Sequence, residues 1–239
     1  LPFRRGTNVV DELRMEFFAD GTAMFEAFTA GILNTMRETS AQAWAERYDF
    51  PRAQSGAVVL SEIPHQRPSG MTGFVMNTRK DAFADWRVRD AMIQAFPAEF
   101  INQTLNGGVD PRITSYFANS PLAMSTDAAT GRVADFLAPF AADLLPGALD
   151  GYVMPVSDGS ERNRAGIVAA LAALEAAGYT VREGVMTTPD GAPFTFDILL
   201  QTGSAENDAI VNIYTEALDR LGIAVSVSRV DAAQFRERR

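Results

Sequence analysis

The chain has 239 residues, a mass of 25.9 kDa and 47% hydrophobic residues, so it can bury a full core and is not globally disordered. Its net charge of −9, from 30 acidic and 21 basic residues, argues against a surface for nucleic acid or anionic membranes, because both need a basic footprint. The absence of cysteine excludes disulfides and thiolate chemistry, the single histidine (His65) excludes multi-histidine metal sites, and no apolar run reaches the roughly 20 residues of a membrane-spanning helix.

The first elements are predicted from apolar periodicity and from capping residues. Apolar and charged residues alternate over 12–17, which predicts a strand with one buried face. Asp20 stands where a helix N-cap is expected, and Gly31 is placed to end that helix. A short strand is expected at 33–36. A second helix is expected over 41–48.

The middle of the chain is predicted to contain two strands, a loop and two helices. Residues 57–60 are β-prone, and residues 71–77 resemble a central strand that is buried on both faces. Prolines and a glycine between them predict a loop at 64–70. A helix capped by its first residue is expected over 85–96, and a proline-initiated helix over 97–105.

Residues 107–160 are rich in proline and glycine, and they are expected to form an irregular excursion with short helices near 131–144. Regular structure then resumes with a helix over 161–177, a hairpin of strands 181–186 and 194–200, a helix over 204–221 and a strand over 223–228. Because strands alternate with helices, the predicted fold class is α/β, with a mostly parallel or mixed sheet flanked by helices.

Sequence signatures of common enzymes are absent. The sequence holds no P-loop, nucleophile elbow, dinucleotide fingerprint or calcium loop. His65 has no acid at a fixed spacing, so a solvated or structural loop residue is favoured over a catalytic base. The acid pairs Asp81/Asp85 and Glu206/Asp208 are interpreted as favourable charges at helix N-termini. The sequence therefore favours a binding lobe over an enzyme, with no catalytic residue and no metal site.

The stretch 65–79, followed by Phe-Ala-Asp-Trp-Arg-Val-Arg-Asp-Ala at 83–91, resembles the family 5 bacterial extracellular solute-binding proteins. These are the oligopeptide- and dipeptide-binding components of ABC importers. The loop His-x-Arg-Pro-x-Gly-Met-x-Gly is most similar to the Yej-type branch. Shorter similar motifs are Asp49-Phe50-Pro51, Ser115–Ser120, Asn163-Arg164, Pro193–Leu200 and Leu221–Ile223. The likeness runs from about Val10 to the C-terminus.

The resemblance implies the class II periplasmic binding protein fold, in which two lobes close on a ligand. Residues 1–239 would form one α/β lobe, the second of the two, within a longer protein. The implied function is to bind short peptides in the periplasm and deliver them to a membrane permease and its ATPase, without a cofactor. Two alternatives stay open: another solute (a sugar, an opine, a metal chelate or a peptide-like antibiotic), or an α/β hydrolytic domain that uses His65.

The resemblance also implies where the ligand lies, because the segment matching residues 71–77 begins at the cleft in peptide-binding relatives. The candidate lining residues are Gly70, Met71, Thr72 and Phe74. Gly70 and Gly73 would let a peptide backbone approach and pair with main-chain groups. Arg67 would offer a charge to a peptide carboxylate. Tyr116 would bring an aromatic ring from a polar loop.

Overall fold

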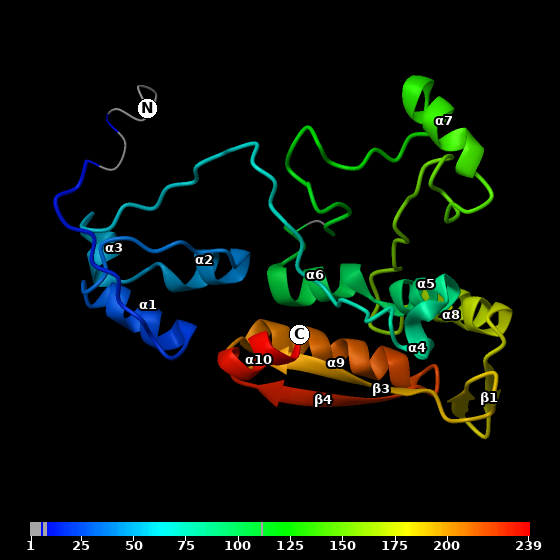
Figure 1. Cartoon of the computed structure of the whole chain (residues 1–239). Coiled ribbons are helices and arrows are strands. Elements are labelled where there is room, and N and C mark those ends of the chain that lie inside the picture. Colours follow the sequence, from blue (N-terminus) through cyan, green and yellow to red (C-terminus); the bar gives the residue numbers. More distant parts are fainter. Residues whose placement is uncertain (1–5, 7–8, 111) are drawn as a thin grey trace.

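The computed structural model describes residues 6, 9–110 and 112–239 (Figure 1). The helices are α1 (Gly21–Thr29), α2 (Ala41–Arg47), α3 (Pro51–Gln54), α4 (Asp81–Ala84), α5 (Trp86–Ala95), α6 (Ala98–Asn106), α7 (Gly131–Leu137), the 3₁₀ helix η2 (Ala138–Phe140), α8 (Arg164–Ala176), α9 (Ala205–Asp219) and α10 (Ala232–Arg238). The strands are β1 (Thr180–Arg182), β2 (Val185–Thr187), β3 (Thr195–Gln201) and β4 (Ala224–Val230). Every predicted helix is present, and the α/β class is confirmed.

The strands form two separate pairs rather than one central sheet. β3 and β4 are parallel, with Phe196 opposite Val225 and Ile198 opposite Val227, and α9 is the crossover between them. Figure 1 shows α9 lying along this pair. β1 and β2 are antiparallel. Both strand orientations are present, but in the described residues they lie in two separate sheets and not in the single central sheet that was predicted.

The predicted hairpin between 181–186 and 194–200 is present only at its closed end, where the Phe194 N–H donates to the Met186 carbonyl oxygen (2.7 Å) across the turn at 189–191. β1 instead pairs with β2 across Glu183 and Gly184, which both have the positive φ that a two-residue hairpin turn requires. β3 pairs along its length with β4, and in the described residues the predicted pairing is limited to the Thr187–Pro193 bridge. Most of the strand pairing is therefore supplied by a short local turn and a long parallel crossover, and little of it by the expected hairpin.

The main core lies where α5, α8 and α9 meet. Its fully buried side chains face inward at the positions that helical periodicity predicts, and each large one contributes about 1.5–3 kcal/mol to folding. The most buried members on these three helices are Val88, Ala91, Met92, Ala95, Ala170, Leu174, Ala217 and Leu218. Their alanines allow the helices to approach closely.

Asn163 locks α8 against α5. Its side chain is 1% exposed, its Nδ2 donates to the carbonyl oxygen of Gln94 (2.9 Å), and its Oδ1 accepts from the Gly166 N–H (3.3 Å). A Cβ atom at Gly166 would overlap the same Gln94 oxygen. The start of α8 is therefore both capped and bound to the neighbouring helix.

Helices α1–α3 form a second, aromatic cluster, which Figure 1 shows joined to α4 by a long irregular segment. Phe25 and Phe28 are buried with Tyr48, and Trp44 packs on Tyr48 with ring centroids 5.3 Å apart. Asp20 caps α1 as predicted.

Four predicted strands are absent from the structure. They are residues 12–17, 33–36, 57–60 and 71–77. Each has the composition of a strand, but none meets a partner strand among the described residues, and an unpaired strand leaves its backbone groups unbonded.

Residues 74–77 keep the side-chain alternation of a strand, with one face turned to the core. Phe74 and Met76 pack against the core, whereas Val75 between them is 93% exposed. The prediction that both faces are buried is therefore wrong.

The excursion over 107–160 is present, and α7 and η2 fall where short helices were expected. Figure 1 shows α7 at its outer end, away from the β3–β4 pair. Among the described residues, no helix combines the length and apolar character needed to cross a membrane.

Candidate ligand-binding site

Two loops that are distant in sequence lie together at the predicted site. The Ser69 N–H donates to the Ala118 carbonyl oxygen (2.9 Å), and Asn119 Nδ2 donates to the carbonyl oxygens of His65 (2.8 Å) and Arg67 (3.2 Å). We call residues 65–70 and 115–124 the loop pair. It brings the loop that carries Arg67 and Gly70 beside the loop that carries Tyr116.

The second loop of the pair is ordered by its own hydroxyl groups. Ser115 Oγ accepts from the N–H groups of Phe117 (3.2 Å) and Met124 (3.1 Å), and Ser120 Oγ donates to the Phe117 carbonyl oxygen (2.7 Å). This turn leaves Tyr116 70% and Phe117 50% exposed. Two aromatic rings are thus presented to solvent on a self-bonded loop, where they are available for apolar contact.

The segment 70–76 offers main-chain groups to a ligand. Within the described residues, none of its backbone N–H or carbonyl groups has a hydrogen-bond partner. Gly70 has a φ of +77°, which favours glycine, and Gly73 has open space where a Cβ would stand. A peptide backbone can add as a strand to a segment whose main-chain groups are free, and here the chain bends once, at Gly73.

The lining candidates differ in their surroundings. Met71 is 44% exposed, Thr72 is exposed, and Gly70 is half-buried, so these three lie on the accessible side. The ring of Phe74 packs 4.8 Å from Tyr214 and 6.0 Å from Phe96, centroid to centroid. In this structure Phe74 therefore fixes the segment to the core.

Arg67 and His65 lie on the exposed part of the same loop. No carboxylate pairs with Arg67 in the part of the chain that the structure describes, so its guanidinium group is available to an anion. His65 Nδ1 accepts from the Arg67 N–H (3.3 Å) and lies 3.4 Å from Asn119 Nδ2. These neighbours supply neither a nucleophile nor an orienting acid.

The ends of the excursion are braced against α6. Glu99 accepts hydrogen bonds from the N–H (2.7 Å) and the Oγ of Ser157, and Arg112 Nη1 donates to the Pro155 carbonyl oxygen (2.7 Å). Burial raises the pKa of Glu99, but the bonds from Ser157 outweigh it and leave that pKa below its usual value. Burial lowers the pKa of Arg112, whose guanidinium group lies 5.5 Å from the ring centroid of Phe96. This brace closes the loop that carries residues 115–124.

The carboxyl ends of β3 and β4 form a further edge that the sequence reasoning missed. The Thr202 N–H donates to the Val230 carbonyl oxygen (2.9 Å), and Ser204 caps α9 two residues later. Ligands of open α/β sheets bind outside the carboxyl ends of the strands. The sequence feature that could have indicated this place is Gly203, which lies between a strand and the serine that caps the next helix. Phe74 packs against the cluster of β3 side chains, so the segment 70–76 lies beside this strand.

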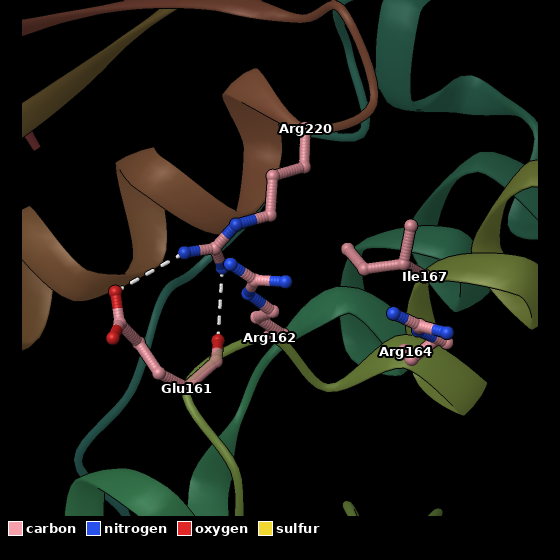
Figure 2. Close-up of a pocket in the computed structure, with 5 residues that line it drawn as sticks. All are labelled: Glu161, Arg162, Arg164, Ile167 and Arg220. Atoms are coloured by element: carbon pink, nitrogen blue, oxygen red, sulfur yellow. Dashed lines mark hydrogen bonds and ion pairs between the residues drawn. The ribbon is translucent and has the colours of Figure 1, made fainter.

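A separate pocket of about 480 Å³ lies between the start of α8 and the end of α9 (Figure 2). Its lining residues are Glu161, Arg162, Arg164, Ile167 and Arg220. Arg220 is held there by the carbonyl oxygen (2.8 Å) and the carboxylate (3.2 Å) of Glu161. None of the sequence candidates lines this pocket. In the described residues, no group of three or more acidic or histidine side chains could hold a metal ion.

Comparison with known families gives one match that covers almost the whole chain. The sequence model of the "bacterial extracellular solute-binding proteins, family 5 Middle" matches residues 3–239. A putative binding protein of Brucella melitensis is 37% identical over 100% of this chain and 39% of its own length. The peptidoglycan-binding protein YepA of Agrobacterium fabrum is 32% identical, over 100% of this chain and 40% of its own length. The probable peptide-binding protein YejA of the same organism is 31% identical, over 98% of this chain and 38% of its own length.

Solved structures share the fold at low sequence identity. The oligopeptide-binding protein AppA from Bacillus subtilis has a TM-score of 0.60 at 19% identity, covering 92% of this chain and 36% of AppA. NikA from Brucella suis, in complex with Fe(III)-EDTA, has a TM-score of 0.52 at 18% identity, covering 92% of this chain and 37% of NikA. This fold is that of the class II periplasmic binding proteins. The family and its relatives indicate a binding protein rather than an enzyme. The chain spans about two fifths of the length of the curated relatives it matches.

Proposed function

Because this chain belongs to family 5 of the bacterial extracellular solute-binding proteins, we propose that it forms one lobe of a protein that binds short peptides. The lobe would close on the peptide together with the rest of that protein, in the periplasm. The loaded protein would deliver its ligand to the permease and ATPase of an ABC importer. This role requires no cofactor and no catalytic residue.

The observation that carries the proposal is the unpaired main chain of residues 70–76 beside the loop pair. A peptide that adds as a strand gains main-chain hydrogen bonds that do not depend on its side chains, which suits a carrier of varied peptides. Arg67 would receive the carboxylate of the peptide. Tyr116 would contact a peptide side chain.

A second candidate ligand is a peptide derived from peptidoglycan. The support is the peptidoglycan-binding protein YepA, which is 32% identical over the whole of this chain. A peptidoglycan peptide also carries backbone amide groups and a free carboxylate, so it would bind through the same kinds of group. The two ligands differ in the attached sugars, and binding experiments can separate them.

The first test identifies the natural ligand. The longest natural protein that contains this chain is purified from its host, denatured gently and analysed by mass spectrometry for released small molecules. Short peptides would support the main proposal, and peptides with amino sugars would support the second. A sugar or a metal chelate without a peptide would contradict both.

The second test addresses the binding groups by calorimetry, with a short peptide and the same peptide amidated at its C-terminus. We expect Arg67→Ala to weaken binding of the free-acid peptide by roughly tenfold, since a charge-assisted hydrogen bond is lost, and to leave the amide nearly unaffected. The matched control is Arg162→Ala, which removes an exposed arginine outside the loop pair. Equal effects of both variants, or equal loss for both peptides, would contradict the role of Arg67.

A further inference from the structure

The strongest link between the two loops of the pair is a single side chain. Both N–H bonds of the Asn119 amide point at the first loop, where the carbonyl oxygens of His65 (2.8 Å) and Arg67 (3.2 Å) accept from Nδ2. The Ser69 N–H and Oγ then reach back to the Ala118 carbonyl oxygen at 2.9 Å and 3.3 Å. The two loops thus bind each other in both directions across about 50 residues of sequence.

The backbone of Asn119 is shaped for this contact. Its φ is +64°, in the left-handed region, which asparagine tolerates better than most residues other than glycine. Two other described non-glycine residues have positive φ, and each has a local reason: Asn163 caps α8, and Glu183 lies in the β1–β2 turn. Asn119 caps no helix and lies in no hairpin. Its conformation serves the contact with the first loop.

The contact orders the surface rather than the core. Asn119, His65 and Arg67 are all exposed, so these hydrogen bonds compete with water and add little to the free energy of unfolding. Their effect is to restrict the loops before a ligand arrives, and ordering a binding loop in advance removes part of the entropic cost of binding.

We propose that Asn119 is a positioning residue for the ligand site, one that holds Arg67 and Tyr116 at a fixed spacing by joining their loops. This inference rests on the proposed function. The carbonyl oxygen of Arg67 is bonded directly, and Tyr116 lies three residues before Asn119 on the same self-bonded turn. Without the amide, the two loops would be joined only through the bonds of Ser69 to Ala118, and the side chains of Arg67 and Tyr116 would be held less firmly relative to each other.

The test uses the longest natural protein that contains this chain. Asn119→Gly keeps the left-handed backbone and removes the amide, and Asn119→Asp keeps the size of the side chain but turns a carboxylate oxygen toward two carbonyl oxygens. Asn77→Asp is the matched control: it adds the same charge nearby, and Asn77 accepts through its oxygen from the Arg79 N–H, which an aspartate retains.

Three measurements are made on each variant: hydrogen exchange of the Ser69 amide, calorimetric affinity for a short peptide and its C-terminal amide, and the thermal midpoint. We expect both Asn119 variants to lose protection at Ser69 and to bind the free-acid peptide roughly five- to tenfold more weakly. The preference for the free acid over the amide should also fall, because it depends on where Arg67 is held. Asn77→Asp should behave as the wild type.

Each other outcome overturns the inference. Faster exchange at Ser69 with unchanged peptide affinity would show that the contact does not serve the ligand, while the proposed function stands. Equal weakening for acid and amide, with a lowered thermal midpoint, would identify a purely structural role. A wild-type protein that binds no short peptide would overturn the proposed function and this inference together.

Discussion

The phenol of Tyr214, in α9, donates a hydrogen bond of 2.9 Å to the backbone carbonyl oxygen of Met92, in α5. Met92 lies in the last turn of α5, where carbonyl groups lose their helical partners, and the Phe96 N–H bonds Ile93 instead. Both side chains are buried, at 4% and 1% exposure. A tyrosine from a distant helix therefore satisfies a carbonyl group that water cannot reach, and burial raises the pKa of this phenol.

Removal of this hydroxyl should destabilise the protein. Tyr214→Phe keeps the ring and leaves the Met92 carbonyl oxygen buried without its partner, so we expect a loss of about 1–3 kcal/mol in the free energy of unfolding, measured in urea. Tyr116→Phe is the control, because its phenol is 70% exposed, and it should change stability by less than about 0.5 kcal/mol. Equal values for the two variants would mean that the Met92 bond does not stabilise the fold.

The close contact between α5 and α8 requires a glycine at position 166, because any side chain there would meet α5. Gly166→Ala would place a methyl group on the Gln94 carbonyl oxygen and on the Asn163 amide, so the helices must separate. We expect a loss of about 1–3 kcal/mol or more, although alanine favours helix. Gly21→Ala, also in the first turn of a helix but with nothing within 4 Å, should be neutral or stabilising in the same thermal unfolding experiment. A stabilised Gly166→Ala would contradict the close packing.

The helices could be predicted from the sequence because their signals are local. Asp20 and Asp85 cap helices that begin at the next residue, as expected. Strands depend on partners elsewhere in the chain. The pairing of β3 with β4 spans the whole of α9, and 71–77 has the apolar residues of a strand but no described partner. Composition indicates that a segment can be extended, whereas pairing decides whether it is a strand.

For the candidate site too, the local loop could be predicted from the sequence, but its contact with a distant loop could not. The turn residues of 64–70 predict a loop, and the family resemblance makes that loop a candidate for ligand binding. No spacing in the sequence shows that this loop meets residues 115–120, because that contact depends on the left-handed backbone of Asn119 and on a brace between Glu99 and Ser157, which are 58 residues apart. Sequence periodicity carries no information about such contacts.

The brace at Glu99 should make stability depend on pH. Because the folded pKa of Glu99 lies below its usual 4.5, its bonds to Ser157 are fully present above that pH and are lost as the pH falls through the lower, folded value. We expect the difference in unfolding free energy between wild type and Glu99→Gln to be constant near neutral pH and to shrink in acid. Glu175→Gln, which replaces an exposed carboxylate on α8, is the matched control in the same experiment. A Glu99→Gln difference that does not change with pH would exclude an ionised Glu99 in the brace.

The aromatic cluster of α1–α3 should weaken in alkali through Tyr48. Burial, and then the Glu38 carboxylate 3.2 Å from the phenol, raise the pKa of Tyr48 from 10.0 to about 12. A folded pKa above the unfolded one means that this contribution to stability is complete below pH 10 and is lost as the pH rises through 12. Tyr48→Phe removes the titrating group and keeps the ring among Phe25 and Phe28.

We therefore expect wild type to lose stability relative to Tyr48→Phe over that range, in urea unfolding followed by the fluorescence of Trp44, which packs on Tyr48. Parallel stability curves for the two proteins over this range would show that the pKa of Tyr48 is the same in the folded and unfolded states. They would also contradict the electrostatic effect assigned to Glu38.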